Sequence, residues 1–188
     1  MADQPRPLRA DAARNRARVL EVAYETFAEE GLSVPIDEIA RRAGVGAGTV
    51  YRHFPTKEAL FEAIASSRIQ YLIDSAARFA ETEDPGAAFL GYLAMLIEEG
   101  AKDQGLMEAL AGIGYDVTAA IPGAEKQFMS TLEGMLVRAQ ESGAVRPDIE
   151  VRDVKALMVG CQAMQRYSAD PATARRTLAV MRDGLLAR

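Results

Sequence analysis

The chain has 188 residues, 49% of them hydrophobic and 26% charged, which is typical of a folded globular protein and excludes a disordered one. One cysteine and one histidine exclude an internal disulfide and a zinc site, so we expect neither a metal nor a cofactor. No apolar run reaches the roughly 20 residues that span a bilayer, and the charged start lacks the hydrophobic part of a signal peptide. We therefore expect a cytoplasmic chain with no membrane partner.

The charges are unevenly distributed along the chain. A net charge of −5 argues against nucleic-acid binding if it is spread evenly. Residues 1–60 carry nine Lys or Arg and nine Asp or Glu, so the whole acidic excess lies in residues 61–188. Arginines gather near the start, among them Arg14 and Arg16, where they could meet the phosphates of a nucleic acid. The alternative is a solvated charged leader with no ligand.

Residues 1–60 predict an arm followed by three helices. Gly31 ends the first helix, Gly44 suits the left-handed position after the second, and Pro55 ends the third. Only three residues separate the second helix from the third. In chain order we expect a flexible basic arm over 1–10 and helices over 12–30, 36–43 and 47–54.

The rest of the chain predicts further helices and no strand. Thr56 caps an amphipathic helix over 57–79. Glycine- and proline-containing breaks then separate helical segments over about 87–102, 105–116, 123–142, 151–168 and 171–187. No segment alternates with a period of two, so the predicted fold class is all-α, with about nine helices in total.

A short stretch has the spacing of a helix-turn-helix. Two short helices that cross steeply need a small residue at their contact, a residue that tolerates positive φ at the turn, and an apolar residue that packs back. Ala40, Gly44 and Val50 meet these needs in turn. A plain helical hairpin with the same residues stays open at this point.

The sequence around this spacing resembles a known family. The run GAGTVYRHFPTKEALF, residues 46–61, follows IDEIA, residues 36–40. Over about residues 12–64 the chain resembles the tetracycline-repressor (TetR) family of regulators. The resemblance implies a homodimer whose third helix enters the major groove of double-stranded operator DNA, and a C-terminal domain that receives a small-molecule effector which weakens DNA binding. It also favours a repressor over an activator.

These expectations define four parts of the chain. We expect a flexible basic arm over 1–10, a three-helix helix-turn-helix DNA-binding domain over 11–55, a linking helix over 56–84, and an effector-binding and dimerisation domain over 85–188.

The third helix has the residue types expected of a DNA-reading helix. Its first residues are small, so the helix can approach DNA closely. Thr49 and Arg52 can contact base edges, and Tyr51 and His53 can contact phosphates. Phe54 is expected to pack in the core instead. The full set of expected DNA contacts is Gly46, Ala47, Gly48, Thr49, Tyr51, Arg52, His53, Thr56, Lys57, Arg14 and Arg16.

Two positions depart from the family pattern. Pro35 stands where a hydroxyl residue usually opens the second helix, and Gly46 stands where serine is frequent. Two contacts to DNA are therefore missing, and we expect affinity to depend more on the N-terminal arginines. Deletion of residues 2–10 without loss of operator affinity would contradict this.

The C-terminal half is rich in methionine. Seven of the eight methionines lie beyond residue 90, and flexible, polarizable side chains suit a pocket that must repack around a ligand. The alternative is simple core filling. The expected ligand-binding residues, which suit an apolar or aromatic effector, are Met95, Met107, Tyr115, Phe128, Met129, Met135 and Gln162.

The last two helices carry stripes that predict a dimer interface. The stripe residues are Ala156, Gly160 and Ala163 on one helix and Leu178, Met181 and Leu185 on the next. Alternatively, both stripes face the subunit's own core. A dimer is also expected because one short recognition helix reads too few base pairs for specific binding. Cys161 is expected to be a small buried residue and not a redox sensor.

Two other functional classes were considered. A constitutive DNA-binding protein whose C-terminal domain only dimerises is the main alternative to a ligand-responsive regulator. An enzyme is not expected, because the sequence has no glycine-rich phosphate loop and no catalytic residues can be assigned.

Overall fold

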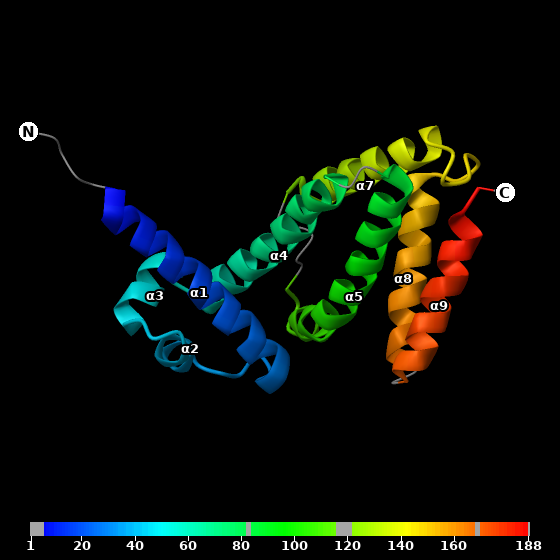
Figure 1. The fold of residues 1–188 in the computed structure, drawn as a ribbon. Helices are drawn as coiled ribbons and strands as arrows, with labels where there is room; N and C mark the ends of the chain where they lie inside the picture. The colour runs from blue at the N-terminus through cyan, green and yellow to red at the C-terminus, as the bar shows by residue number, and fades with distance from the viewer. Residues whose placement is uncertain (1–5, 82–83, 116–121, 168–169, 188) are drawn as a thin grey trace, which may run out of the picture. The chain divides into compact units, whose positions relative to one another are not determined.

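The computed structural model of the chain describes residues 6–81, 84–115, 122–167 and 170–187. The regular elements in these ranges are all helices, which confirms the predicted all-α fold (Figure 1). None of them is long and apolar enough to cross a lipid bilayer. In chain order they are α1 (Arg6–Glu30), α2 (Ile36–Arg42), α3 (Ala47–His53), α4 (Lys57–Ala80), α5 (Pro85–Gly112), α7 (Ala124–Glu141), α8 (Val151–Tyr167) and α9 (Pro171–Leu185).

Helix α1 begins at Arg6, so residues 6–10 of the expected flexible arm are helical. Several other helix ends lie where glycine, proline and capping residues predict them. Gly31 ends α1 with a φ of +83°, and its N–H donates to the Phe27 carbonyl at 3.1 Å. Asp170 caps α9, since its carboxylate accepts hydrogen bonds from the backbone N–H groups of Ala172 and Thr173. Pro171 then occupies the first helical position, where a missing N–H has no cost.

Helix α5 is longer than the sequence predicts. The sequence indicates a break at Gly105, but the helix runs without interruption from Pro85 to Gly112. A glycine inside a helix costs about 1 kcal/mol relative to alanine. Leu106 and Leu110 are buried just beyond it, and each buried leucine contributes about 2 kcal/mol. Packing therefore outweighs the cost of Gly105.

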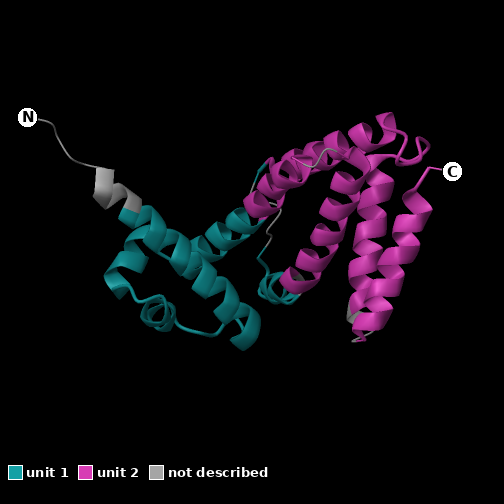
Figure 2. Ribbon diagram, viewed as in Figure 1, with its two compact units in different colours: residues 1–68, 105–122 teal, residues 69–104, 123–188 magenta. Residues whose placement is uncertain are grey.

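The first of two compact units comprises residues 1–68 and 105–122 (Figure 2). Its core joins apolar side chains from α1, α2, α3 and the first half of α4 to Leu106 and Leu110 of α5. The rings of Phe27 and Phe61 meet edge to face in this core, with centroids 5.1 Å apart.

The second unit comprises residues 69–104 and 123–188 and has a core of its own. Helices α8 and α9 pack against each other there. Gly91 lets α4 and α5 approach closely, since a β-carbon at Gly91 would lie 2.9 Å from the Phe79 ring. The buried Tyr92 hydroxyl donates to the Leu72 carbonyl at 3.0 Å, and burial raises the pKa of Tyr92 to about 12. The last residues are also tied down, because Val145 and Leu186 form an isolated β-bridge.

The compact units divide the chain differently from the expected domains. The part of α4 up to residue 68 belongs to the first unit, and the part from residue 69 belongs to the second. Helix α5 divides between Gln104 and Gly105. Segment 105–115, expected in the effector-binding domain, thus packs with the helix-turn-helix.

Candidate nucleic-acid interface

Helices α2 and α3 form the predicted helix-turn-helix. Ala40 of α2 and Val50 of α3 are both buried in the core of the first unit, where the two helices pack together. Gly44 has a φ of +65°, a conformation that residues with a β-carbon rarely adopt. The N–H of Val45 donates to the Ala40 carbonyl at 3.0 Å and closes the turn. The roles predicted for Ala40, Gly44 and Val50 are confirmed.

Helix α3 buries one face and exposes the other. Phe54, directly after the helix, is buried as predicted. Tyr51 is 43% exposed, which confirms that its phenol does not belong to the core. The remaining residues expected on the DNA-reading face are exposed (Gly46, Gly48, Arg52 and His53) or half-buried (Ala47 and Thr49). An exposed face of this composition is able to enter the major groove.

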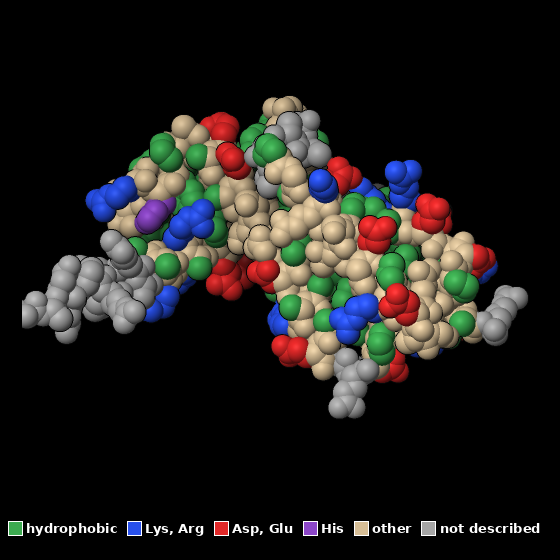
Figure 3. Space-filling view, turned by 90° about the horizontal axis from the view of Figure 1, so that it is seen from above, with side chains coloured by type: hydrophobic (Ala, Val, Ile, Leu, Met, Phe, Trp, Pro, Cys, Tyr) green, Lys and Arg blue, Asp and Glu red, His purple; other side chains and the backbone are tan. Residues whose placement is uncertain are grey.

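Arginines of α1 flank this face. The Arg16 guanidinium lies 5.3 Å from the centroid of the Phe54 ring, a cation–π contact at the end of α3. Arg14 is exposed and paired with Asp11. Figure 3 shows the single histidine at the surface with Lys or Arg side chains on either side of it. The basic side chains that the sequence places near the start of α1 thus include one fixed beside the reading helix.

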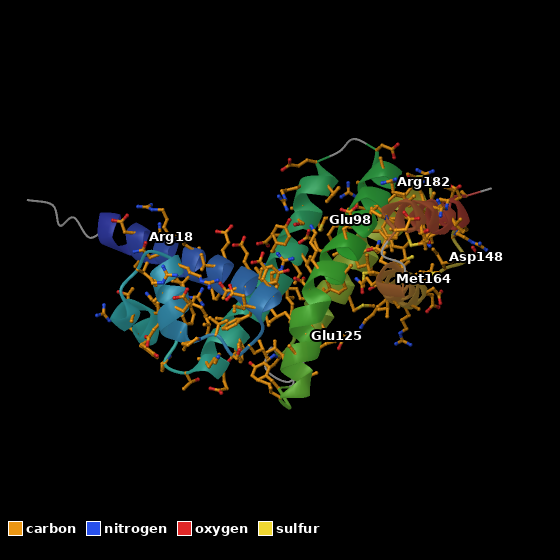
Figure 4. All side chains as sticks on the ribbon, turned by 90° about the horizontal axis from the view of Figure 1, so that it is seen from below. Arg18, Glu98, Glu125, Asp148, Met164 and Arg182 are labelled. Atoms are coloured by element: carbon orange, nitrogen blue, oxygen red, sulfur yellow. The ribbon has the colours of Figure 1, made fainter. Side chains whose placement is uncertain are left out.

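Arg18 belongs with this group, as its place in the arginine cluster near the start of the chain predicts. It is exposed on α1 and labelled in Figure 4. Its Nη2 atom lies 3.9 Å from the place where a β-carbon on Gly44 would be. Arg14 and Arg18 are four residues apart on one helix face, and this spacing was the available signal.

The start of α4 is anchored by two predicted contact residues. The Thr56 hydroxyl accepts a hydrogen bond from the Ala59 N–H at 3.1 Å, which confirms Thr56 as the helix cap. The Lys57 amino group donates to the Val34 carbonyl at 2.8 Å and lies 5.5 Å from the centroid of the Phe27 ring. Burial lowers the pKa of Lys57. An ammonium group has three hydrogens, so this bond leaves two for a phosphate.

Two further basic residues of the helix-turn-helix are held by carboxylates. Glu38 accepts hydrogen bonds from Arg41 at 2.6 and 2.8 Å and from Arg42 at 2.7 Å. Arg42 also pairs with Glu30 at the end of α1. The guanidinium groups of Arg41 and Arg42 lower the pKa of Glu38 to about 2. Arg42 therefore holds α2 on α1.

Comparison with known proteins identifies the chain. Residues 19–64 match the model of the bacterial regulatory proteins of the TetR family, and residues 84–187 match the SbtR-like transcriptional regulator C-terminal domain. A TetR transcription regulatory protein from Mycobacterium vanbaalenii is 51% identical, with 96% of this chain and 100% of that one covered and a TM-score of 0.83. The chain belongs to the TetR family of transcriptional regulators. It is therefore a DNA-binding regulator.

Other transcriptional regulators are similar to the chain over its whole length or over part of it. The regulator SCO0520 from Streptomyces coelicolor is 32% identical, covers 92% of this chain and 98% of its own, and has a TM-score of 0.77. HTH-type transcriptional regulators of Staphylococcus aureus are 44% identical over 54 residues, which is 28% of this chain and only 29% of theirs. FadR from Bacillus subtilis, solved with stearoyl-CoA, is 18% identical and shares the fold, with a TM-score of 0.66 and coverage of 90% and 99%.

The residues expected to bind an effector fall in both units of this TetR-family chain and have different surroundings. Met107 and Tyr115 pack against the core of the first unit. Met95, Phe128 and Met135 belong to the core of the second unit. Met129 lines a groove of about 970 Å³ beside α7 and α8. Gln162 donates to the Leu96 carbonyl at 3.2 Å.

The stripes expected at the dimer interface have different surroundings. A mainly apolar groove of about 590 Å³ lies along α8 and α9, and its walls include Ala156, Gly160 and Met181. Ala163 is exposed, while Leu178 packs against the core and Leu185 is only 2% exposed. Leu185 therefore faces its own subunit. The walls of the groove also include three exposed apolar residues that were not expected from the sequence, namely Leu157, Met164 and Val180, and Figure 4 labels Met164.

Cys161 is buried beside the same groove. Its sulfur lies 3.6 Å from the Met181 sulfur, and burial raises the pKa of the thiol. The prediction of a buried thiol is confirmed. Within the described part of the chain, no three His, Cys, Asp or Glu side chains gather where they could hold a metal ion.

Proposed function

We propose that this TetR-family regulator is a repressor that binds a palindromic operator as a homodimer in the cytoplasm and is released by a small apolar or aromatic effector. The observation that carries the DNA-binding part is the exposed face of α3, where Tyr51 and Arg52 are exposed while Val50 holds the helix in the core. Thr49 and Arg52 contact base edges, and Tyr51, His53 and Lys57 contact phosphates.

The proposed dimer uses the apolar surface of α8 and α9. Val180 is 73% exposed, Met164 49% and Leu157 42%. Monomers rarely expose adjoining large apolar side chains without a partner. A two-fold pair of such surfaces would form a four-helix interface, and it would hold two α3 helices for successive major grooves about 34 Å apart.

Support for an effector comes from the fold. FadR from Bacillus subtilis, which shares it, was solved with stearoyl-CoA. In this chain Met95, Phe128 and Met135 supply apolar surface within the second unit. An effector that binds one state of that unit more tightly than another would shift the DNA-binding equilibrium.

The second candidate is a constitutive regulator whose C-terminal part only dimerises. The scatter of Met107, Tyr115 and Met129 over separate surroundings favours it. Thermal-shift screening with apolar and aromatic compounds separates the two candidates. A compound that raises the melting temperature and releases DNA supports the repressor, and a screen without such a compound supports the constitutive regulator.

The first experiment tests DNA binding itself. Fluorescent genomic fragments, beginning with the DNA that flanks this gene, are titrated with wild type and Tyr51→Ala at about 150 mM salt. We expect one palindromic fragment to bind wild type tightly and the variant at least tenfold more weakly. Thermal unfolding serves as the control, because an exposed Tyr51 contributes little to folding. Equal binding of both proteins would contradict the assignment of α3 as the reading helix.

A further inference from the structure

The end of α5 is built into the DNA-binding unit. Leu106 and Leu110 are buried in the same core as Val50 and Phe54 of the helix-turn-helix. Met107 and Tyr115 pack against that core. The family model of the C-terminal domain spans 84–187 and so includes this segment. Its packing nevertheless assigns the segment to the DNA-binding unit.

A turn at the end of α5 fixes the position of Tyr115. Gly114 has a φ of +77°, and its N–H donates to the Ala111 carbonyl at 2.9 Å. The Tyr115 N–H donates to the Leu110 carbonyl at 3.0 Å. This pair of hydrogen bonds is a Schellman motif, in which the residue after glycine packs back on the helix end. The backbone therefore holds the Tyr115 ring against the core.

A row of three aromatic rings begins with Tyr115 and ends on α1. The Tyr115 and Phe61 rings meet edge to face with centroids 6.2 Å apart. The Phe61 and Phe27 rings meet in the same way at 5.1 Å. The Lys57 amino group lies over the other end of this row, 5.5 Å from the Phe27 centroid, and bonds the Val34 carbonyl just before α2. The row thus joins α5, α4 and α1, the helix that packs on α2 and α3.

The surroundings of Tyr115 favour a neutral, fixed phenol. Burial and the nearby carboxylates of Glu62 and Glu58 raise the pKa of Tyr115. Both glutamates belong to α4, so the ring is set against this helix as well as against the Phe61 ring.

We infer that Tyr115 is a positioning residue for DNA binding, which acts through Phe61 and Phe27 to hold α4 and α1 in the arrangement that presents α3. The inference rests on DNA binding through α3 and needs no effector. Helix α5 itself is continuous, with its residues up to 104 in the second unit and its residues from 105 in the first.

Hydrogen exchange of the full-length protein tests the packing without any DNA. We expect Tyr115→Ala to raise exchange about tenfold or more in peptides from α1 and α2, since lost aromatic packing lowers the free energy of local opening. Peptides from α8 and α9 stay as in wild type. Tyr115→Phe keeps the ring and restores protection. Phe79→Ala is the matched control, because Phe79 is a half-buried aromatic of α4 paired with Tyr92 in the second unit.

The control should raise exchange in the second unit alone. Unchanged exchange of α1 and α2 in Tyr115→Ala would overturn the inference, as would an equal rise throughout the chain. With the palindromic fragment from the first experiment as probe, Tyr115→Ala should bind at least tenfold more weakly with an unchanged salt dependence, because no phosphate contact is lost. A reduced salt dependence would instead make Tyr115 a DNA contact. The exchange result stands even if no fragment is found, so the two proposals fail separately.

Discussion

The ammonium group of Lys57 makes a hydrogen bond within the fold and is proposed to contact a DNA phosphate as well. It donates to the Val34 carbonyl across 23 positions of the chain, and it stands at the first residue of α4, which begins shortly after α3, the proposed DNA-reading helix. A hydrogen bond from a charged donor contributes about 1 kcal/mol or more when it is partly buried. The same charge is available to a phosphate.

Lys57→Met should therefore lower both stability and the salt dependence of DNA binding. We expect a loss of about 1 kcal/mol in the free energy of unfolding, with a fall of about one in the slope of log K against log salt. Urea denaturation and titrations at several salt concentrations measure these quantities. Lys126→Met, at an exposed position of α7, should change neither. A variant as stable as wild type would show that the bond to Val34 contributes nothing.

The ion pairs of Arg42 predict that the free energy of unfolding depends on pH. Hydrogen bonds from Arg41 and Arg42 lower the pKa of Glu38 to about 2, and Arg42 also lowers the pKa of Glu30. Both carboxylates have a folded pKa below the unfolded value, so they stabilise the fold above about pH 4.5 and lose that effect as the pH falls toward 2. The groups are exposed, so the effect is small and weakened by salt.

We expect Arg42→Met to be less stable than wild type at pH 7, with the difference shrinking at pH 3. Urea denaturation at both pH values checks this, and Arg138→Met, at an exposed position of α7, should keep a constant difference. A difference for Arg42→Met that stays constant with pH would mean that its carboxylate partners do not titrate together with folding.

Residues whose role depends on local sequence were predictable, and those whose role depends on tertiary contacts were not. The spacing of Ala40, Gly44 and Val50 indicated the turn, since helix geometry alone sets it. The contact of Tyr115 with Phe61 joins positions 54 residues apart. No periodicity reports such a pairing, and the effector contact expected of Tyr115 from the sequence stays a prediction.

At the scale of elements, α5 shows how packing overrides a local signal. Gly105 indicates a break, yet the helix continues because Leu106 and Leu110 are buried. Three other glycines of this helix serve close contacts: β-carbons there would meet Ala144, Phe79 and Gln162. Composition alone cannot separate glycines that are needed from those that are only tolerated.

Two alanine substitutions in α5 should therefore have opposite effects. Gly105→Ala should raise the free energy of unfolding by about 0.5–1 kcal/mol, since no atom lies within 4 Å of the added carbon and alanine favours the helix. Gly86→Ala should lower it, because the added carbon would lie 2.3 Å from the β-carbon of Ala144, which cannot rotate away. Urea denaturation compares the two directly. A loss of stability in Gly105→Ala would show that the glycine has a role beyond the helix.

At the scale of the whole molecule, α8 and α9 carry apolar residues of two kinds, buried ones and exposed ones. Leu185 is buried in the subunit's own core, while Val180 is 73% exposed. The stripes in the sequence included Leu185 but not Val180, because helical spacing does not tell a residue buried in its own subunit from one open to a partner. Exposure separates the two: Leu185 stabilises the subunit, and Val180 is open to a partner.

A charge at position 180 should weaken the proposed dimer without lowering the stability of the subunit. In Val180→Asp the new carboxylate is exposed to water in the monomer, so the melting temperature of the subunit should change little. In the proposed dimer the carboxylate would be buried and would lose its hydration. We expect the dissociation constant of the dimer, measured by sedimentation, to rise about a hundredfold, since two carboxylates meet across a two-fold interface. Affinity for the full palindrome should fall accordingly, while affinity for a single half-site stays. Val137→Asp places the same charge on the exposed face of α7 and should remain dimeric. A dimeric Val180→Asp that still binds the palindrome would place the subunit interface elsewhere.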